Sequence, residues 1–280
     1  MSYAIKNILV PTDFSANANN AMRLAVAIAV RHGAALHLLN IVTAHLSLPS
    51  IGAISGAGDE LALLIGTAKE HVDNDRAAIL KAHELEVTAV AGFGAISTNI
   101  NAYVITYEID LVVMGTHGIS GWKEFLIGST AMSVIKESPC PVLTVPVNYL
   151  KSTFDKVLYP MRNVERVVVK YNYIKSIVKK NNSDIHLLGV IQNGEIDDHD
   201  LINNMKKVID SILDDMGEVT YEKHFCENIA DKILETANSR KDDLMVINAT
   251  LDTDWKDYFS GSITQQIVNH AMVPVLALKV

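Results

Sequence analysis

The residues best suited to chemistry form a glycine-rich loop near the end of the first half of the chain. Gly115-Thr-His-Gly118 is followed, after nine residues, by Gly128-Ser129-Thr130, which opens a predicted helix. Glycines let backbone N–H groups approach phosphate oxygens closely, and a helix N-terminus adds unpaired donors and the positive end of its dipole. The spacing, with the Ser129 and Thr130 hydroxyls beside it, therefore predicts a phosphate-binding loop.

A second segment, Pro11-Thr12-Asp13, follows the first predicted strand. Ligands of an open α/β sheet lie at the carboxyl ends of its strands, so we expect this segment and the glycine loop to form one site. The Asp13 carboxylate can accept hydrogen bonds from a ribose or a base amine; alternatively, it only caps the following helix in an Asp-Phe-Ser turn. His117 lies within the loop, where contact with a phosphate and simple exposure are both open.

The elements that must position these residues alternate short apolar runs with longer helical patterns, which predicts β-α-β units and a parallel sheet. The strands of the first half are expected at residues 5–10, 35–42, 87–91, 111–114 and 142–147. The helices between them are expected at residues 17–32, 61–84, 97–107 and 129–137. Ser15 is the predicted N-cap of the first helix, and Gly33 is predicted to end it.

The second half of the chain repeats the first. His37-Leu-Leu-Asn-Ile-Val42 recurs as His186-Leu-Leu-Gly-Val-Ile191 at an offset of 149, and Asp110-Leu-Val-Val-Met114 recurs as Asp243-Leu-Met-Val-Ile247 at an offset of 133. Collinear matches of this kind indicate a duplication. We therefore predict two Rossmann-like α/β domains, residues 1–148 and 154–280, each a five-stranded parallel sheet flanked by helices.

The second half departs from the first at the positions that carry the chemistry. Asn248 stands at the place of Gly115, Leu251 at that of Gly118, and Arg162 at that of Asp13, although Gly261 and Ser262 are retained. Side chains now occupy the space that phosphates would need, and a carboxylate has become a guanidinium. We expect that the second half does not bind ATP in the same way.

Three motifs of the first half together resemble the universal stress protein family (UspA-like), here in tandem. They are Val10-Pro-Thr-Asp13, the spaced glycines, and Ser138-Pro-Cys-Pro-Val142. The resemblance is to the ATP-binding branch, and it implies an adenine nucleotide alpha hydrolase-like fold and a regulatory role in the stress response with at most weak ATP hydrolysis. It also implies bound ATP, ADP or AMP, with Mg²⁺.

The resemblance further implies where the nucleotide lies. Adenine would pack near Asp13 and the end of the second strand, and the phosphates would lie on the glycine loop. The residues of this candidate nucleotide site are Pro11, Thr12, Asp13, Ile41, Val42, Met114, Gly115, His117, Gly118, Gly128, Ser129 and Thr130.

Composition excludes several other classes of partner. With a net charge of −8 and no large basic cluster, the chain is not expected to bind nucleic acid. No apolar run approaches the roughly 18 residues that cross a bilayer, and no secretory signal is evident, so we expect a cytoplasmic protein. The two cysteines, Cys140 and Cys226, are expected to be reduced.

A binding protein with an unknown protein partner is the favoured function. An ATPase or nucleotidyl enzyme is disfavoured because no lysine follows the glycines as in a P-loop, and a module that binds no nucleotide is the third alternative. The last strands, 142–147 and 273–278, are apolar edges of a kind that tends to be paired. The resemblance implies that the two repeats pair with each other through these strands, as an intrachain pseudo-dimer. Whether the chain also forms a homodimer is left open.

Overall fold

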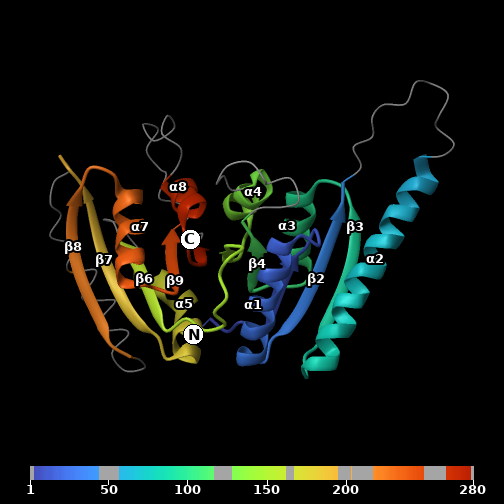
Figure 1. Cartoon of the computed structure of the whole chain (residues 1–280), viewed down its shortest axis with the longest axis horizontal. Helices are drawn as coiled ribbons and strands as arrows, with labels where there is room; N and C mark the ends of the chain where they lie inside the picture. The colour runs from blue at the N-terminus through green and yellow to red at the C-terminus, as the bar shows by residue number, and fades with distance from the viewer. Residues whose placement is uncertain are drawn as a thin grey trace.

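The computed structural model describes residues 3–43, 57–116, 128–161, 167–194, 203, 217–248 and 263–278. Within them, ten strands form one sheet that runs the length of the molecule (Figure 1). The first repeat supplies β1 (Asn7–Pro11), β2 (Ala35–Val42), β3 (Val87–Phe93), β4 (Leu111–Gly115) and β5 (Val142–Val145). The second supplies β6 (Lys156–Met161), β7 (Asp184–Gln192), β8 (Val219–Cys226), β9 (Leu244–Asn248) and β10 (Val275–Leu278).

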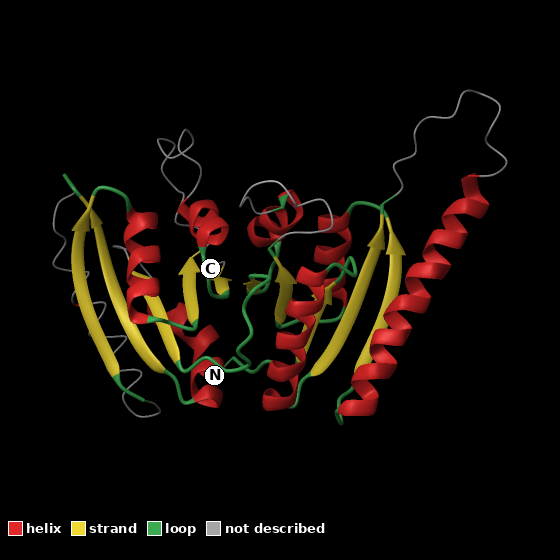
Figure 2. Ribbon diagram, viewed as in Figure 1, coloured by secondary structure: helices red, strands yellow, loops and turns green. Residues whose placement is uncertain are grey.

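The strand order is β3-β2-β1-β4-β5-β10-β9-β6-β7-β8. Pairing is parallel within each repeat, and β5 and β10 meet antiparallel, with Leu143 opposite Leu276. The prediction of two five-stranded parallel sheets is therefore confirmed, as is the pairing of the two last strands. The outer strands of both repeats point to the same side of the molecule (Figure 2), so both carboxyl edges face that side.

Helices cover both faces of the sheet. In the first repeat they are α1 (Ala16–His32), α2 (Ala57–Ala82), α3 (Ile96–Thr106) and α4 (Ser129–Glu137). In the second repeat they include α5 (Val167–Asn181), α7 (Ile229–Arg240) and α8 (Ile263–His270). Side chains of α1, α2 and α5 share one core cluster, and those of α3, α4, α7 and α8 share the other. None of the described helices is long and apolar enough to span a membrane.

Helix α1 shows why its sequence forms a helix with these ends. Ser15 has an extended backbone, and its side chain accepts the N–H of Ala18 at 3.1 Å, which confirms the predicted N-cap. Gly33 ends the helix in the left-handed region at φ 66°, a conformation that glycine adopts without steric cost. The small and apolar residues between them are buried against the sheet, and the most buried are Ala21, Leu24, Ala25, Ile28 and Ala29.

Two predicted strand ends shift for identifiable reasons. The first strand begins at Asn7 rather than residue 5, because the N–H groups of Lys6 and Asn7 bond to the carboxylate of Asp110 instead of a neighbouring strand. The last strand of the first repeat ends at Val145, because Pro146 has no N–H for a further ladder bond. The Pro146 carbonyl accepts a hydrogen bond from the Asn20 side chain at 2.9 Å.

The two repeats also share a core beneath the linker. Phe154, directly after the linker, is fully buried in the same cluster as residues from α1 and α5, and the rings of Tyr3 and Tyr173 lie 4.7 Å apart. The Arg23 guanidinium of α1 donates to the linker carbonyls of Tyr149 and Lys151 at 2.9 and 3.2 Å. The linker is thus bound along the first repeat rather than spanning open solvent.

Candidate functional site

The candidate site lies where the direction of the sheet topology changes. β1 pairs with β2 on one side and β4 on the other, so the connections after β1 and β4 lead away to opposite sides. Such a switch point leaves a crevice outside the carboxyl ends of the two strands, and ligands of open α/β sheets bind there. Among the described residues, the segment after β1 lies at this position together with Gly115, which ends β4, and Gly128.

The segment after β1 is held by hydrogen bonds on both sides. The N–H of Thr12 donates to the Leu39 carbonyl at 2.9 Å, and the Asn40 amide donates to the Thr12 carbonyl at 2.8 Å. The Thr12 hydroxyl accepts the N–H of Phe14 at 3.1 Å. Phe14 itself has φ 63°, an unfavourable conformation for a residue with a side chain, and such conformations persist where the surroundings fix them.

Asp13 makes the turn, but Ser15 caps the helix. One Asp13 carboxylate oxygen accepts the N–H of Ser15 at 3.1 Å, which is an Asx turn, while the Ser15 hydroxyl accepts the N–H of Ala18. The Asp-Phe-Ser turn that the sequence offered for Asp13 is therefore present, but the side chain that caps the helix is that of Ser15. The turn holds the half-buried carboxylate at the carboxyl edge of β1.

Helix α2 packs against this turn from outside. The His71 ring meets the Phe14 ring edge-on, with centroids 5.0 Å apart. One turn further along α2, burial raises the pKa of Asp75, and the nearby His71 opposes that rise. The turn is therefore fixed by packing as well as by hydrogen bonds.

Gly115 is required by the close approach of α1. A Cβ at this position would lie 2.9 Å from Cγ of Asn17 and 3.1 Å from its backbone carbonyl carbon. The Asn17 amide reaches the hydroxyl of the buried Thr116 at 3.4 Å, so β4 and α1 meet through polar groups beneath the site. Any larger residue at position 115 must displace the first turn of α1.

The two residues that flank the glycine loop, Thr116 and Gly128, are joined by a hydrogen bond. The N–H of Gly128 donates to the Thr116 carbonyl at 3.0 Å, which joins the ends of segment 117–127. Gly128 is the N-cap residue of α4 and has no side chain with which to cap the helix, so it leaves the N–H groups of the first turn to other acceptors. Ser129 is exposed and Thr130 is half-buried beside them. The described atoms thus bring Asp13, Gly115, Gly128, Ser129 and Thr130 to one edge of the sheet.

The remaining predicted site residues differ in how much of each is accessible at this edge. Ile41 and Val42 are half-buried at the end of β2, and the side chain of Met114 lies in the core with 6% exposure. Only the main chain of Met114 is therefore available at the edge. His117 and Gly118 lie outside the described residues.

Polar residues that the motif did not mark support the site from below. Asn17, Asn40 and Thr116 are buried, and each bonds to or beside a motif residue. A detectable signal existed for one of them, because Asn40 interrupts the otherwise apolar run of β2, whereas Asn17 lies in a segment that already contains Asn19 and Asn20. Among the described residues, no group of three or more His, Cys, Asp or Glu is arranged to hold a metal ion.

The second repeat differs at the same place. Asn248, which ends β9 where Gly115 ends β4, is buried with 5% exposure. An amide side chain therefore stands at the position where the first repeat has a glycine. The other exchanged positions, Arg162, Leu251, Gly261 and Ser262, lie outside the described residues.

This geometry defines an α/β protein made of two repeats, each with a parallel sheet between helices and with its candidate site at the carboxyl ends of the strands. The universal stress protein family model matches residues 4–146 and again 172–279, and the chain belongs to that family. Its two domains have the adenine nucleotide alpha hydrolase-like fold.

Relatives and solved structures agree with this placement. A protein of Staphylococcus aureus strain USA300, whose name places it among the universal stress proteins, is 28% identical over 151 residues, which cover 53% of this chain and 89% of that protein. The crystal structure of a universal stress protein from Archaeoglobus fulgidus DSM 4304 matches with a TM-score of 0.75 and 20% identity, over 99% of this chain and 97% of that one. A functionally unknown protein from Pseudomonas aeruginosa PAO1 matches with a TM-score of 0.67 and 17% identity, over 99% and 93%. The last two likenesses concern the fold, and both extend across the two repeats.

Proposed function

We propose that the first repeat binds an adenine nucleotide, ATP or its ADP and AMP forms, and that the protein acts as a regulatory binding protein rather than an efficient enzyme. The observation that carries the proposal is the glycine geometry. A Cβ at Gly115 would lie 2.9 Å from Asn17 of α1, whereas a Cβ at Gly128 would lie no closer than 3.8 Å to any atom of the described residues. Relative to that described part of the chain, Gly128 leaves room beside the first turn of α4.

The residues present fit such a ligand. Phosphate oxygens would accept hydrogen bonds from the first-turn N–H groups of α4 and from the Ser129 and Thr130 hydroxyls, with the positive end of the helix dipole adding attraction. The carboxylate of Asp13, fixed by its turn, would accept hydrogen bonds from ribose or base N–H groups. Mg²⁺ bound with the phosphates would neutralise part of their charge.

Adenine would lie against the half-buried ends of β2, where Ile41 and Val42 offer apolar surface. We further propose that the second repeat does not bind ATP in this manner, as its sequence indicates. Asn248 fills the position that the first repeat keeps as glycine. One nucleotide per chain is the resulting stoichiometry.

The decisive experiment is calorimetric titration of the full chain with Mg²⁺-ATP, beside the variant Gly128→Ala. The backbone of Gly128, at φ −60° and ψ 143°, is open to alanine, so this variant should fold normally. Its methyl group would occupy phosphate space, and we expect affinity to fall by about tenfold or more, equivalent to roughly 1.4 kcal/mol. Gly66→Ala on α2, also with no atom near its Cβ, is the matched control and should leave binding unchanged.

The outcomes separate the alternatives. One site per chain that weakens in Gly128→Ala but not in Gly66→Ala supports the proposal. No heat of binding in the wild type would overturn it and favour an interaction module without nucleotide. Steady release of phosphate during the same incubation would instead make the protein an ATPase.

A further inference from the structure

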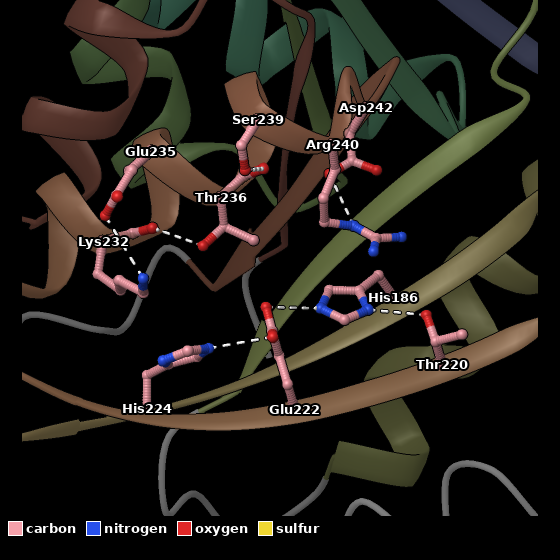
Figure 3. Close-up of polar contacts among 10 residues, drawn as sticks. All are labelled: His186, Thr220, Glu222, His224, Lys232, Glu235, Thr236, Ser239, Arg240 and Asp242. Atoms are coloured by element: carbon pink, nitrogen blue, oxygen red, sulfur yellow. Dashed lines mark hydrogen bonds and ion pairs between the residues drawn. The ribbon is translucent and has the colours of Figure 1, made fainter.

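A polar seam lies between α7 and the two outer strands of the second repeat, β7 and β8 (Figure 3). His186 comes from β7, three residues come from β8, and two lie at and just beyond the end of α7. The residues of the seam are His186, Thr220, Glu222, His224, Arg240 and Asp242. Because β8 is the end strand of the sheet order, the seam lies beside the edge of the molecule.

Glu222 is shared by two imidazoles. Nε2 of His186 and Nε2 of His224 each lie 3.1 Å from a different oxygen of the Glu222 carboxylate. Nδ1 of His186 lies 2.7 Å from the Thr220 hydroxyl, so a neutral His186 donates from Nε2 to Glu222 and accepts from Thr220 at Nδ1. His186 thereby binds two side chains of β8 to β7.

The charges around these groups favour that neutral form of His186. Burial lowers the pKa of His186, the Glu222 hydrogen bond opposes this, and the charge of Arg240 lowers the pKa further. Burial acts to raise the pKa of Glu222, but the hydrogen bonds from His224 and His186 outweigh it and lower that pKa. Glu222 is thus an anion held by two donors.

Asp242 is the unusual member of the seam. Its side chain is fully buried, neither carboxylate oxygen has a hydrogen bond, and its ion-pair partner is Nε of Arg240 at 3.6 Å. That Nε also makes no hydrogen bond. Burial raises the pKa of Asp242 to about 6, opposed by Arg240 and Lys156 and reinforced by Asp243. A buried carboxylate so poorly satisfied takes up a proton at a higher pH than an exposed one does.

The fold itself does not need these polar groups, because the first repeat builds the same place from other residues. Tyr107 lies at the position of Arg240, and Ile109 at that of Asp242, both at the offset of 133. Through the strand registers, Val90 corresponds to Glu222, and Gly92 corresponds to His224. An apolar and aromatic cover therefore suffices for packing, and the polar seam has another role.

We propose that the seam is a proton-operated switch, in which protonation of Asp242 releases Arg240, and Arg240 then takes the Glu222 carboxylate from the two imidazoles and loosens β8 from β7. The Arg240 side chain lies between Asp242 and the His186 ring (Figure 3), so a rotation of its side chain redirects it. An arginine–carboxylate pair can form two parallel charge-assisted hydrogen bonds, which are stronger than those of neutral imidazoles.

The other charged groups near the seam do not compete for this role. On α7, Lys232 pairs with Glu235 at 3.4 Å near the surface. At the start of β9, Asp243 accepts the N–H groups of Asp155 and Lys156 and the ammonium of Lys151. On the other side of β7, the neighbouring β6 presents Leu158 opposite His186, so no charge faces the imidazole from there.

The test is amide hydrogen exchange of β8 between pH 7.5 and 5.2, corrected for intrinsic rates, together with the imidazole NMR signals of His186 and His224. We expect the protection of β8 amides to fall about tenfold with a midpoint near the pH 6 titration of Asp242, with both imidazole signals shifting in the same step. The β3 amides of the first repeat, which has no such seam, serve as the internal control and should not change. In Asp242→Asn, which imitates the protonated carboxyl, the loosened state should be present already at pH 7.5.

Two further variants decide between the outcomes. Glu222→Gln removes the anion that Arg240 would move to, so the pH step in β8 should disappear, and this holds even if Asp242→Asn folds poorly. Glu235→Gln on the exposed face of α7 should keep the step. The switch is overturned if wild-type β8 protection is constant over this range, if Glu222→Gln retains the midpoint, or if a folded Asp242→Asn responds to pH as the wild type does.

Discussion

The two repeats place different chemistry on one backbone. In both, an aspartate that precedes the fourth strand fixes the start of the first: Oδ2 of Asp110 accepts two N–H groups before and at the start of β1, at 2.7 and 2.9 Å, and Oδ2 of Asp243 accepts two before and at the start of β6, both at 3.1 Å. By contrast, Gly115 at the end of β4 corresponds to Asn248 at the end of β9. The contacts that align the strands are kept in both repeats, while the residues at the strand ends differ.

A histidine on the second strand of each repeat gives a finer comparison. His37 on β2 bonds through Nδ1 to the Tyr103 hydroxyl at 3.1 Å, and its ring packs against Tyr103 and Tyr107. His186 on β7 meets a hydroxyl and a carboxylate of β8 instead. Burial lowers the pKa of both histidines. A buried imidazole at this position is thus compatible with either aromatic or polar neighbours. Only the polar neighbours of His186 include groups that can exchange hydrogen-bond partners.

The largest expected effect comes from giving the first repeat the residue of the second. In Gly115→Asn, a Cβ would lie 2.9 Å from Asn17, so the first turn of α1 must move. We expect nucleotide affinity to fall about 100-fold or more, roughly 2.7 kcal/mol, and unfolding free energy to fall by about 1–3 kcal/mol. Calorimetry and urea denaturation measure both. The reciprocal Asn248→Gly should create no ATP site, and unaltered affinity in Gly115→Asn would break the comparison.

The second-largest difference is expected between the residues that pack over the second strand in each repeat, namely the tyrosines of the first repeat and the polar groups of the second. Tyr103 is 8% exposed, stacks on Tyr107 with ring centroids 4.1 Å apart and bonds to His37, so Tyr103→Ala should cost about 3–4 kcal/mol in urea denaturation. At the equivalent position, the Thr236 hydroxyl bonds only within its own helix, to the Lys232 carbonyl at 2.8 Å. Thr236→Ala should cost roughly 1 kcal/mol or less. Equal losses would show that the two covers contribute alike.

A smaller difference in unfolding free energy is expected between the equivalent aspartates Asp110 and Asp243. Asp243 has a side chain that is 4% exposed and accepts the Lys151 ammonium as well as two N–H groups. Asp243→Ala should therefore lower the free energy of unfolding by about 2–3 kcal/mol, and Asp110→Ala by about 1–2 kcal/mol. Thermal unfolding followed by circular dichroism gives the order. A larger loss in Asp110→Ala would reverse the ranking of the two contacts.

The contact between α1 and α5, where His32 lies near Lys180, should make the free energy of unfolding modestly dependent on pH. Burial lowers the pKa of His32 on α1 from 6.5 to about 4, with the charges of Lys180 on α5 and of Arg31 adding to the effect. The unfolded chain binds this proton first as pH falls, so stability present above pH 6.5 is lost towards pH 4, by roughly 1–2 kcal/mol.

The matched variant for this prediction is His32→Gln, which removes the titrating group but keeps a polar side chain. The quantity to compare is the loss of unfolding free energy between pH 7 and pH 4.5 in each protein, since other carboxyl groups titrate equally in both. The wild type should lose more. An identical loss would assign the pH dependence to groups outside this contact.

Periodicity and duplication were enough to predict the strand content and the parallel pairing, whereas the joining of β5 to β10 was expected from the resemblance to the universal stress proteins. The helix caps were also readable, because Ser15 and Gly33 act through their immediate neighbours in the chain. The polar seam was not readable: its residues come from positions 186, 220–224 and 240–242, and only folding brings them together. The support beneath the site was missed for the same reason, since Asn17 meets Thr116 across 99 residues.

The antiparallel pairing of β5 with β10 has a consequence for how the protein is made. β5 is complete at residue 145, whereas its partner residues are 275–277, so the 129 residues 146–274 are synthesised in between. At typical translation rates of about 5–20 residues per second, this takes roughly 7–26 s. During that time a nascent first repeat carries an open apolar strand edge at the ribosome, where it can pair with another unfinished chain. Slower translation of the second repeat should therefore promote aggregation more than slower translation of the first.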